Sequence, residues 1–328
     1  MPSSDCPITI DFPLEIPTVR RGNHWLARAG SIELRLSNLD KIFWPETGYT
    51  KGDLLTYYFN VSPVIVPHLH ERPLTLKRMP DGVVGPYFYE KDAPSYTPEW
   101  MPTIDVALET EDRTVHALTV CDVASLLWVV NLGCIDLHPL HATGERQTHP
   151  SYAVFDLDPF PPAGFENACE VALLLKVVLD RLGVTAYPKT SGGTGLHIFM
   201  PLDRTHSFDD VRAFVAAVCR IVHRAAPDMT TLDWEVPKRS GRVFLDYGMN
   251  RPQASLSCAY SVRPEWNAPV STPLAWHEFG NLDPAEFTMA TALERVNEVG
   301  DMFAPVLDSP GEATTQAMKD LLRGAGRE

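Results

Sequence analysis

Two aspartates separated by a single residue are the side chains in this sequence best suited to chemistry. The segment 153–159, Ala-Val-Phe-Asp-Leu-Asp-Pro, leads an apolar run directly into Asp156 and Asp158. If the run is a β-strand, alternate side chains share a face, so both carboxylates point the same way. Two carboxylates a few ångströms apart repel each other unless a cation lies between them, and oxygen ligands suit Mg²⁺ or Mn²⁺. The pair indicates a metal centre for phosphoryl transfer, with a strand that ends in two solvated acids as the alternative.

Two later segments contain side chains that such a centre would use. Asp246 follows the apolar run 243–245 and could supply a third carboxylate to the same metals. Arg263, at the end of a Tyr-Ser-Val-Arg segment, could clamp the γ-phosphate of a nucleotide, because a guanidinium forms paired hydrogen bonds with phosphate oxygens. Taken singly, an acid at a strand end and a surface cation are the alternatives.

The segment 190–197, Thr-Ser-Gly-Gly-Thr-Gly-Leu-His, is rich in glycine and in hydroxyl groups. Its glycines allow the backbone to turn sharply and to present amide N–H groups to an anion. Ser191, Thr194 and His197 add side-chain donors, so the loop could hold a triphosphate, with a simple hairpin turn as the alternative. It lacks the Gly-Lys-Ser/Thr ending of a Walker loop, and a strand is expected to follow it where a dinucleotide fingerprint requires a helix.

Basic and aromatic residues lie close together in the segment 76–91. Lys77 and Arg78 are followed by Phe88 and Tyr89. Cations that contact phosphates and rings that stack on bases are typical of nucleic-acid binding. The alternative is a hairpin in which one of the two adjacent rings is buried, because neighbouring strand residues face opposite ways.

Predicted helices and strands are mixed along the chain, which indicates an α/β or mixed α+β fold. Strands are predicted at 32–36, 74–77, 87–90, 184–189, 196–201 and 243–247, and helices begin at Thr50, Asp122, Glu166, Phe208 and Asp283. We divide the chain into an irregular N-terminal arm (1–30), a catalytic domain (31–308) and a polar tail (309–328). Without a strong linker, the domain is expected to form two closely packed lobes that divide near residue 150.

The chain has 328 residues and a formal net charge of −14, which by itself argues against nucleic acid as a partner. Its cations are clustered, however, at 41–91 and at 238–263. Its 6 cysteines form no Cys-x-x-Cys pair, which argues against a zinc site. The sequence contains no apolar run of membrane-spanning length, and the N-terminus lacks the pattern of a signal peptide, so we expect a cytoplasmic protein without a membrane partner.

Several segments together resemble one family. They are Ser-Asn-Leu-Asp-Lys-Ile-Phe-Trp-Pro at 37–45, Thr-Lys-Gly-Asp-Leu at 50–54, Arg-Pro-Leu-Thr-Leu-Lys-Arg at 72–78, Phe-Asp-Leu-Asp-Pro at 155–159, Ser-Gly-Gly-Thr-Gly-Leu-His at 191–197 and Tyr-Ser-Val-Arg at 260–263. From about residue 36 to residue 278 the chain resembles the polymerase domain of bacterial ATP-dependent DNA ligase D, within the archaeo-eukaryotic primase superfamily. The resemblance implies a primase-polymerase fold, with two lobes around a central catalytic cleft.

The activity implied by this resemblance is template-directed, metal-dependent nucleotidyl transfer, which extends primers and fills short DNA gaps with NTPs or dNTPs. Asp156, Asp158 and Asp246 would bind two Mn²⁺ or Mg²⁺ ions. The implied nucleotide-binding residues are His138, Ser191, Gly192, Gly193, Thr194, Gly195, His197, Lys238, Arg239 and Arg263. The implied DNA-binding residues are Asn38, Lys41, Lys51 and Lys77 at a 5′-phosphate, Arg78 beside them, and Phe88 and Tyr89 on the template base.

The chain departs from the family pattern at Thr194, where family members usually carry lysine, and at Met249, where glutamine is common. Nucleotide affinity and sugar preference therefore need not follow the family. The implied setting is a bacterial, nucleoid-associated, stand-alone repair enzyme that works with a separate DNA ligase or other repair proteins, in end joining or in excision repair.

Two other functions are compatible with parts of the sequence. Haloacid-dehalogenase-like phosphohydrolases also place Asp-x-Asp after an apolar strand, but they normally carry Thr or Val where this chain has Phe160. A non-catalytic module that binds DNA gaps or ends would explain the basic clusters but not the three acids.

Overall fold

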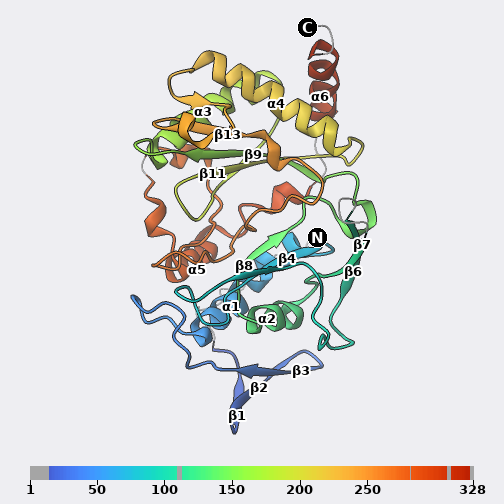
Figure 1. Cartoon of the computed structure of the whole chain (residues 1–328), viewed down its shortest axis with the longest axis vertical. Coiled ribbons are helices and arrows are strands. Elements are labelled where there is room, and N and C mark those ends of the chain that lie inside the picture. Colours follow the sequence, from blue (N-terminus) through green and yellow to red (C-terminus); the bar gives the residue numbers. More distant parts are fainter. Residues whose placement is uncertain (1–14, 109–112, 281, 309–311, 326–328) are drawn as a thin grey trace, which may run out of the picture.

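The computed structural model describes residues 15–108, 113–280, 282–308 and 312–325. Its helices and strands alternate along the chain and form two packed lobes, so the predicted mixed α/β class is confirmed (Figure 1). Two hydrophobic clusters correspond to the lobes, one around α1 and α2 and the other beneath α3 and α4. Of the helices in the described ranges, none combines the length and the apolar character that a membrane crossing requires.

The N-terminal sheet consists of β1 (Thr18–Arg21), β2 (His24–Ala29) and β3 (Ile32–Ser37), paired antiparallel in that order. The prediction of an irregular arm up to residue 30 is therefore wrong for residues 18–29, and residues 1–14 of that arm lie outside the described residues. The chain reverses at Gly22 and Gly30, each with φ of +61°, a conformation that glycine adopts without steric cost. These two turns bring the three strands into register, although β1 and β2 show little hydrophobic pattern of their own.

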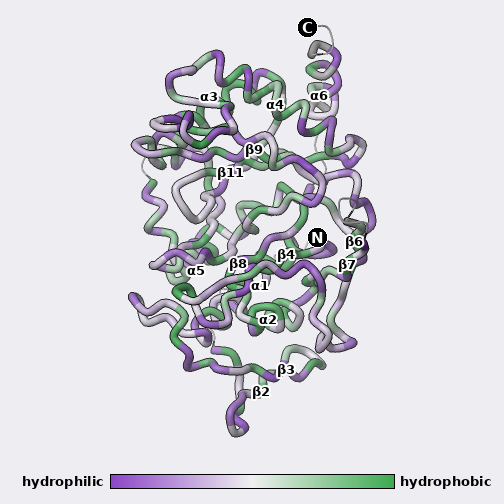
Figure 2. The backbone as a smooth tube through the Cα atoms, viewed as in Figure 1, coloured by the Kyte–Doolittle hydropathy of each residue, from purple (hydrophilic) through white to green (hydrophobic). Residues whose placement is uncertain are grey.

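The lower lobe is built on α1 (Lys51–Leu69), α2 (Val123–Asn131) and a sheet of order β5-β4-β8 (Phe88–Glu90, Leu74–Arg78, Cys134–Pro139). Capping boxes at Thr50 and Asp122 begin the two helices at the predicted positions. Helix α2 is hydrophobic almost throughout and is buried between this sheet and the N-terminal sheet (Figure 2). A separate hairpin, β6 (Thr103–Leu108) with β7 (Arg113–Leu118), flanks this lobe.

The upper lobe contains a five-stranded sheet of order β10-β11-β9-β13-β12, formed by Tyr187–Thr190, Leu196–Pro201, Tyr152–Pro159, Val243–Asp246 and Thr230–Thr231. All neighbours are antiparallel except β12 and β13, which are parallel. Helices α3 (Phe165–Arg181) and α4 (Phe208–Ala225) cover one face, and the other face is turned toward the lower lobe (Figure 1).

Alternation along β9 decides which of its side chains face the lower lobe. Ala153, Phe155 and Leu157 pack beneath α3 and α4. Residues two apart share a face, so Asp156 and Asp158 project from the opposite side of the sheet. The core beneath the two helices thus fixes the direction of both acids.

The last two helices are α5 (Met289–Val299), which packs on α1, and α6 (Glu312–Ala325), which packs on α4. The predicted helix at Asp283 is only the 3₁₀ turn Pro284–Glu286, and α5 begins after Thr288. Residues 312–325 of the predicted polar tail form the helix α6, in which Met318 is fully buried. An amphipathic pattern in an otherwise polar segment holds α6 against the domain.

Met318→Ala tests this packing. Removing a fully buried methionine is expected to lower the free energy of unfolding by about 2–5 kcal/mol. Lys319→Ala, at the exposed neighbouring position, should change it by less than about 0.5 kcal/mol. Chemical denaturation followed by circular dichroism measures both variants, and equal stability of the two would show that the tail is not packed.

Candidate active site

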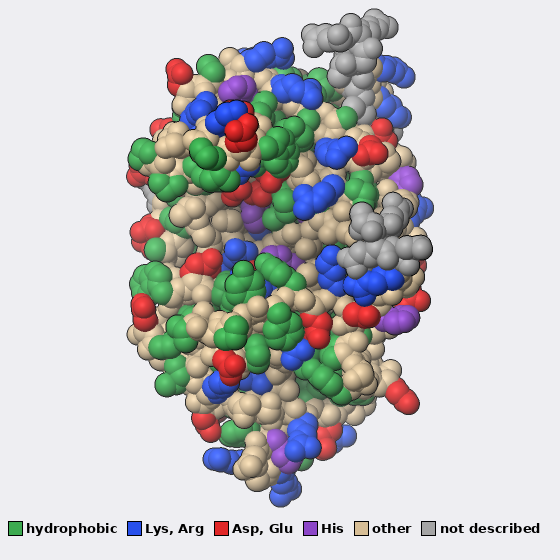
Figure 3. Space-filling view, in the orientation of Figure 1, with side chains coloured by type: hydrophobic (Ala, Val, Ile, Leu, Met, Phe, Trp, Pro, Cys, Tyr) green, Lys and Arg blue, Asp and Glu red, His purple; other side chains and the backbone are tan. Residues whose placement is uncertain are grey.

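The three acids predicted to act together meet on one strand pair. In the antiparallel pairing of β9 with β13, Asp246 lies directly opposite Asp156, and Phe244 lies opposite Asp158. Opposite residues of such a pair share a face, with Cβ atoms about 4.5–5.5 Å apart. The acids therefore project together from the sheet toward the recess between the lobes, where acidic, basic and histidine side chains gather (Figure 3).

These carboxylates destabilise one another's charged forms. Burial, followed by the charges of Asp158 and Asp246, raises the pKa of Asp156 well above its usual range. Burial and the charge of Asp246 also raise the pKa of Asp158, and burial raises the pKa of Asp246. Oxygen Oδ1 of Asp156 is buried and has no hydrogen-bond partner. The three carboxylates therefore carry negative charge that neighbouring side chains do not fully neutralise.

The chemistry of this donor set fits a divalent cation. Carboxylate oxygens are the ligands that Mg²⁺ and Mn²⁺ prefer, and an unpartnered buried carboxylate oxygen is costly without a counter-charge. Among the described residues, no three His, Cys, Asp or Glu side chains are already arranged as a ligand group around one point. Asp156, Asp158 and Asp246 are thus neighbours on the sheet that need side-chain adjustment to share an ion.

The glycine loop joins β10 to β11 and borders the acids. The Ser191 hydroxyl accepts hydrogen bonds from the backbone N–H groups of Gly193 and Gly195, each at 3.1 Å, so both amides shape the loop. A Cβ atom on Gly195 would lie 2.6 Å from the carbonyl oxygen of Leu157, which explains the glycine at this close approach. Thr194 is exposed at the tip.

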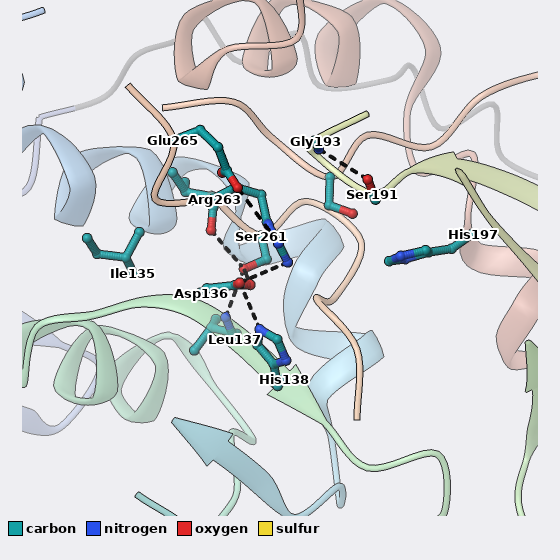
Figure 4. Close-up of polar contacts among 12 residues, drawn as sticks. Ile135, Asp136, Leu137, His138, Ser191, Gly193, His197, Ser261, Arg263 and Glu265 are labelled. Carbon is teal, nitrogen blue, oxygen red and sulfur yellow. Dashed lines mark hydrogen bonds and ion pairs between the residues drawn. The ribbon is translucent and has the colours of Figure 1, made fainter. Parts of the chain in front are cut away.

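Arg263 reaches from this loop to the lower lobe. A Cβ atom on Gly192, whose φ is +78°, would lie 2.3 Å from Cγ of Arg263, so only glycine admits the arginine stem here. The Arg263 guanidinium lies 3.0 Å, Nη1 to Oδ2, from the buried carboxylate of Asp136 on β8. The same oxygen lies 2.7 Å from Nε2 of His138 (Figure 4). The structure thus brings the predicted residues Arg263 and His138 together around Asp136.

His197 lies directly opposite Asp156 on the neighbouring strand β11. Its Nε2 is 3.4 Å from Oδ1 of Asp156, and its Nδ1 is 2.9 Å from Nζ of Lys189. Lys189 is fully buried, and burial lowers its pKa to about 7. Burial, together with Lys189, lowers the pKa of His197 well below its usual range. His197 therefore belongs to a buried chain behind the acids.

The two predicted cations on the short helix Val236–Arg239 differ in position. The Arg239 guanidinium lies 3.6 Å above the ring centroid of Phe244, the residue opposite Asp158, and its charge opposes the rise in the pKa of Asp158. Lys238 forms an exposed ion pair with Glu235, Nζ to Oε1 2.7 Å. Contacts within the described part of the chain connect Arg239, but not Lys238, to the acids.

A cationic group at one side of the lower lobe consists of Lys41, Lys51 and Arg78, with the neutral Asn38 beside them. Asn38 and Lys41 share a turn, closed by a bond from the Lys41 amide to the Asn38 carbonyl, 3.0 Å. Lys51 is buried and donates from Nζ to Oδ1 of Asn131, 2.8 Å. Burial, Lys41 and Arg78 together lower the pKa of Lys51 to about 8. The charges of Lys41 and Arg78, which are themselves paired with Asp81 and Glu90, thus act on Lys51 and make this group a candidate site for an anion.

Lys77 lies elsewhere. Its Nζ is 4.9 Å from the ring centroid of Tyr87, which contacts Tyr89, and Tyr89 in turn contacts His138. The predicted 5′-phosphate group is therefore split, with Lys77 on the nucleotide side. The expectation that Phe88 or Tyr89 is buried is also wrong, since the residues are 44% and 56% exposed. Strand β5 is a three-residue edge strand, and its two rings are covered only in part, Phe88 by Arg78 and Tyr89 by Tyr87.

Sequence reasoning missed Asp136 and Lys189. Each is a single charged residue within a short apolar strand, and both are fully buried. The only sequence signal for Asp136 is its position two residues before His138, which places both on one face of a strand. The only sequence signal for Lys189 is its position just before the glycine loop.

Comparisons with known proteins identify the class of domain to which this fold belongs. The family model of the LigD primase-polymerase domain matches residues 50–303. The chain belongs to this family. It is 30% identical, over 84% of its length, to the multifunctional non-homologous end joining protein LigD of Mycolicibacterium smegmatis. It is also 30% identical, over 89% of its length, to the bifunctional protein LigD of Bacillus subtilis.

The chain spans only part of these relatives, 36% of the first and 47% of the second. It is similar to the solved polymerase domain of Mycobacterium tuberculosis ligase D in complex with DNA, with a TM-score of 0.78 and 29% sequence identity. This match covers 84% of the chain and 99% of that structure. The expected primase-polymerase fold is thereby confirmed, and the structural relative is a protein that binds DNA.

Asp156→Asn tests the repulsion among the acids. In EDTA the variant should be more stable than wild type, because one buried negative charge is gone. We expect its melting temperature to be higher by about 2–4 °C, the shift that about 1 kcal/mol gives in a domain of 150–250 residues. In Mn²⁺ the order should reverse, since wild type alone gains the full stabilisation by ion binding. Asp180→Asn, an exposed acid on α3, is the control and should behave as wild type. Equal responses of all three proteins to Mn²⁺ would contradict the metal assignment.

Proposed function

We propose that this chain is a template-directed, metal-dependent nucleotidyltransferase that extends primers and fills short DNA gaps with NTPs or dNTPs. The observation that carries the proposal is the pairing of β9 with β13, which brings Asp156, Asp158 and Asp246 to one face of one sheet. Opposite them, Arg263 and His138 supply positive charge and ring donors. A divalent-metal site beside a cationic site suits the reaction centre and the triphosphate of one nucleotide.

In the proposed reaction, a primer 3′-hydroxyl attacks the α-phosphate of the nucleotide and pyrophosphate leaves. Two Mn²⁺ or Mg²⁺ ions, when bound, would lower the pKa of the hydroxyl and neutralise the charge that develops on the phosphate oxygens. Asp156, Asp158 and Asp246 would hold both ions. His197, fixed on the adjacent strand by Lys189, lies beside Asp156 Oδ1 and would restrict its rotation.

The triphosphate would lie between the glycine loop and the arginine. The Arg263 guanidinium contacts Asp136 through Nη1 and Glu265 through Nη2, and its buried Nε has no hydrogen-bond partner, so it would have donor capacity left for a phosphate oxygen. The Ser191 hydroxyl fixes the shape of the loop by accepting hydrogen bonds from two backbone amides of the loop. The loop would then be open toward the cleft without having to refold when the nucleotide binds. Pre-organised donors lower the cost of ordering a flexible, highly charged ligand.

DNA would contact the lower lobe at two places. Lys41, Lys51 and Arg78, with Asn38, would bind the 5′-phosphate at the far side of a gap. Tyr89, together with Phe88, would stack on the template base, because both rings are exposed at the edge of the sheet. These local cations allow a chain with a net charge of −14 to approach DNA. A separate DNA ligase would then seal the filled gap.

Asp158→Asn is expected to reduce primer extension on a gapped duplex in Mn²⁺ by about 10²-fold or more, the scale of losing a principal electrostatic group. Asp180→Asn should extend at the wild-type rate. A denaturing gel of labelled primer measures all three proteins. Extension by Asp158→Asn at the wild-type rate would refute the role of the acids. Absence of extension by wild type, with gapped DNA still bound, would favour a non-catalytic gap-binding module.

Lys51→Met is expected to reduce the preference for gapped DNA that carries a 5′-phosphate by about tenfold, because a charged hydrogen-bond donor is lost. Lys77→Met, the matched control on the nucleotide side, should keep that preference. For wild type the preference should decline as pH rises above about 8, because burial lowers the pKa of Lys51 to about 8 and its ammonium then loses its proton. Fluorescence anisotropy with and without the phosphate measures both effects, and an unchanged ratio in Lys51→Met would remove the assignment.

A further inference from the structure

Asp136 is the most deeply buried acid between the lobes, with no exposed surface. Its Oδ2 contacts Nη1 of Arg263 at 3.0 Å and Nε2 of His138 at 2.7 Å. Its Oδ1 accepts a hydrogen bond from the hydroxyl of Ser261, 3.3 Å, two residues before Arg263. The contacts with Arg263, His138 and Ser261 thus connect this carboxylate to the nucleotide side of the proposed site (Figure 4), and a further side-chain contact joins it to Ser257.

Stability alone does not account for such a group. A buried ion pair is often no more stable than apolar side chains of the same volume, because removing two charges from water is expensive. Burial here opposes ionisation, yet the charges of His138 and Arg263 hold the pKa of Asp136 well below its usual range. The Asp136 carboxylate is therefore kept charged, and the main effect of that charge is to orient Arg263 and His138.

Arg263 and His138, the two basic partners of Asp136, contact different parts of the structure. The Arg263 stem passes against Gly192 of the upper-lobe loop, so this arginine connects the two lobes. The His138 ring contacts Tyr89, with ring centroids 6.5 Å apart, and Tyr89 is exposed at the edge of β5. A single carboxylate thus sets the positions of a guanidinium at the glycine loop and of an imidazole beside an exposed aromatic ring.

We propose that Asp136 is the positioning residue of the nucleotide site, where it holds the Arg263 fork and the His138 ring in the orientation in which they meet the triphosphate and sugar of the incoming nucleotide. This inference rests on the proposed function. Asp136 itself does not touch the nucleotide. Its contribution is to remove the rotational freedom of two donors before the nucleotide arrives, which raises affinity without adding a contact.

Asp136→Asn and Asp136→Glu separate this role from a packing role. Asparagine keeps the shape and loses the charge, whereas glutamate keeps the charge and changes the shape. We expect Asp136→Asn to raise the KM for the nucleotide about ten- to hundredfold, with kcat within about threefold and affinity for gapped DNA unchanged. Asp136→Glu should recover most of the loss. If Asp136 only fills space, the order reverses and asparagine is the milder change, which would overturn the proposal.

Asp301→Asn is the matched control. Asp301 is also a mostly buried acid paired with a histidine, 3.0 Å from Nε2 of His68, and it accepts a hydrogen bond from the Tyr260 hydroxyl, 2.7 Å, but its carboxylate contacts neither Arg263 nor His138 in the described structure. This variant should leave the nucleotide KM within about twofold of wild type. A rise as large as that of Asp136→Asn would mean that loss of any buried acid–histidine pair disturbs the site, and the proposal would fail.

A double variant covers the case in which Asp136→Asn does not fold, since it removes the nearer of the two acids that pair with Arg263 and leaves only Glu265, 3.8 Å away. Arg263→Gln removes the arginine charge. If Asp136 acts chiefly through Arg263, adding Asp136→Asn to Arg263→Gln should raise the nucleotide KM by less than about threefold further. A full additional loss would contradict the proposal. Failure of wild-type protein to extend a primer would instead count against the proposed function, and nucleotide affinity measured by calorimetry would still report on Asp136.

Discussion

The antiparallel pairing of β9 with β13 is the constraint on which the rest of the site depends. It places Asp246 opposite Asp156, so the acids cannot separate without breaking the central sheet of the upper lobe. The sheet is held by the apolar face that Phe155 and Leu157 present to α3 and α4. Folding therefore forces like charges together in a partly dry recess, and the free energy of that repulsion becomes available for binding cations.

The same logic of charge balance extends across the recess to the lower lobe. In the lower lobe the buried acid is Asp136, and its partners are two protein side chains, Arg263 and His138. The acids of the upper lobe, by contrast, are short of cations among the described residues. One lobe thus presents unmet negative charge, and the other presents an arginine and a histidine held by one carboxylate. A metal–triphosphate complex carries both signs of charge and complements both lobes.

Much of this arrangement could be predicted from sequence, and the rest had physical reasons for being hidden. Asp156 and Asp158 are visible because strand periodicity fixes their common face, and a glycine run marks the loop at Gly192. That Asp246 joins them depends on a long-range strand pairing, which its place at the end of an apolar run left open and the resemblance to a family implied. Asp136 was missed because a single acid in a short strand looks like a solvated residue until its partners, far along the chain, are known. Strands β1 and β2 and helix α6 were missed because turn glycines and a single apolar stripe carry weak local signals.

The most direct measurement of the central claim is a crystal structure of the protein soaked with Mn²⁺ and a nucleotide, with anomalous scattering recorded at the manganese edge. The account predicts manganese peaks bridged by carboxylate oxygens of Asp156 and Asp158, with Asp246 coordinating one of them. Manganese bound elsewhere, or an Asp246 carboxylate that stays turned away from every peak, would contradict it.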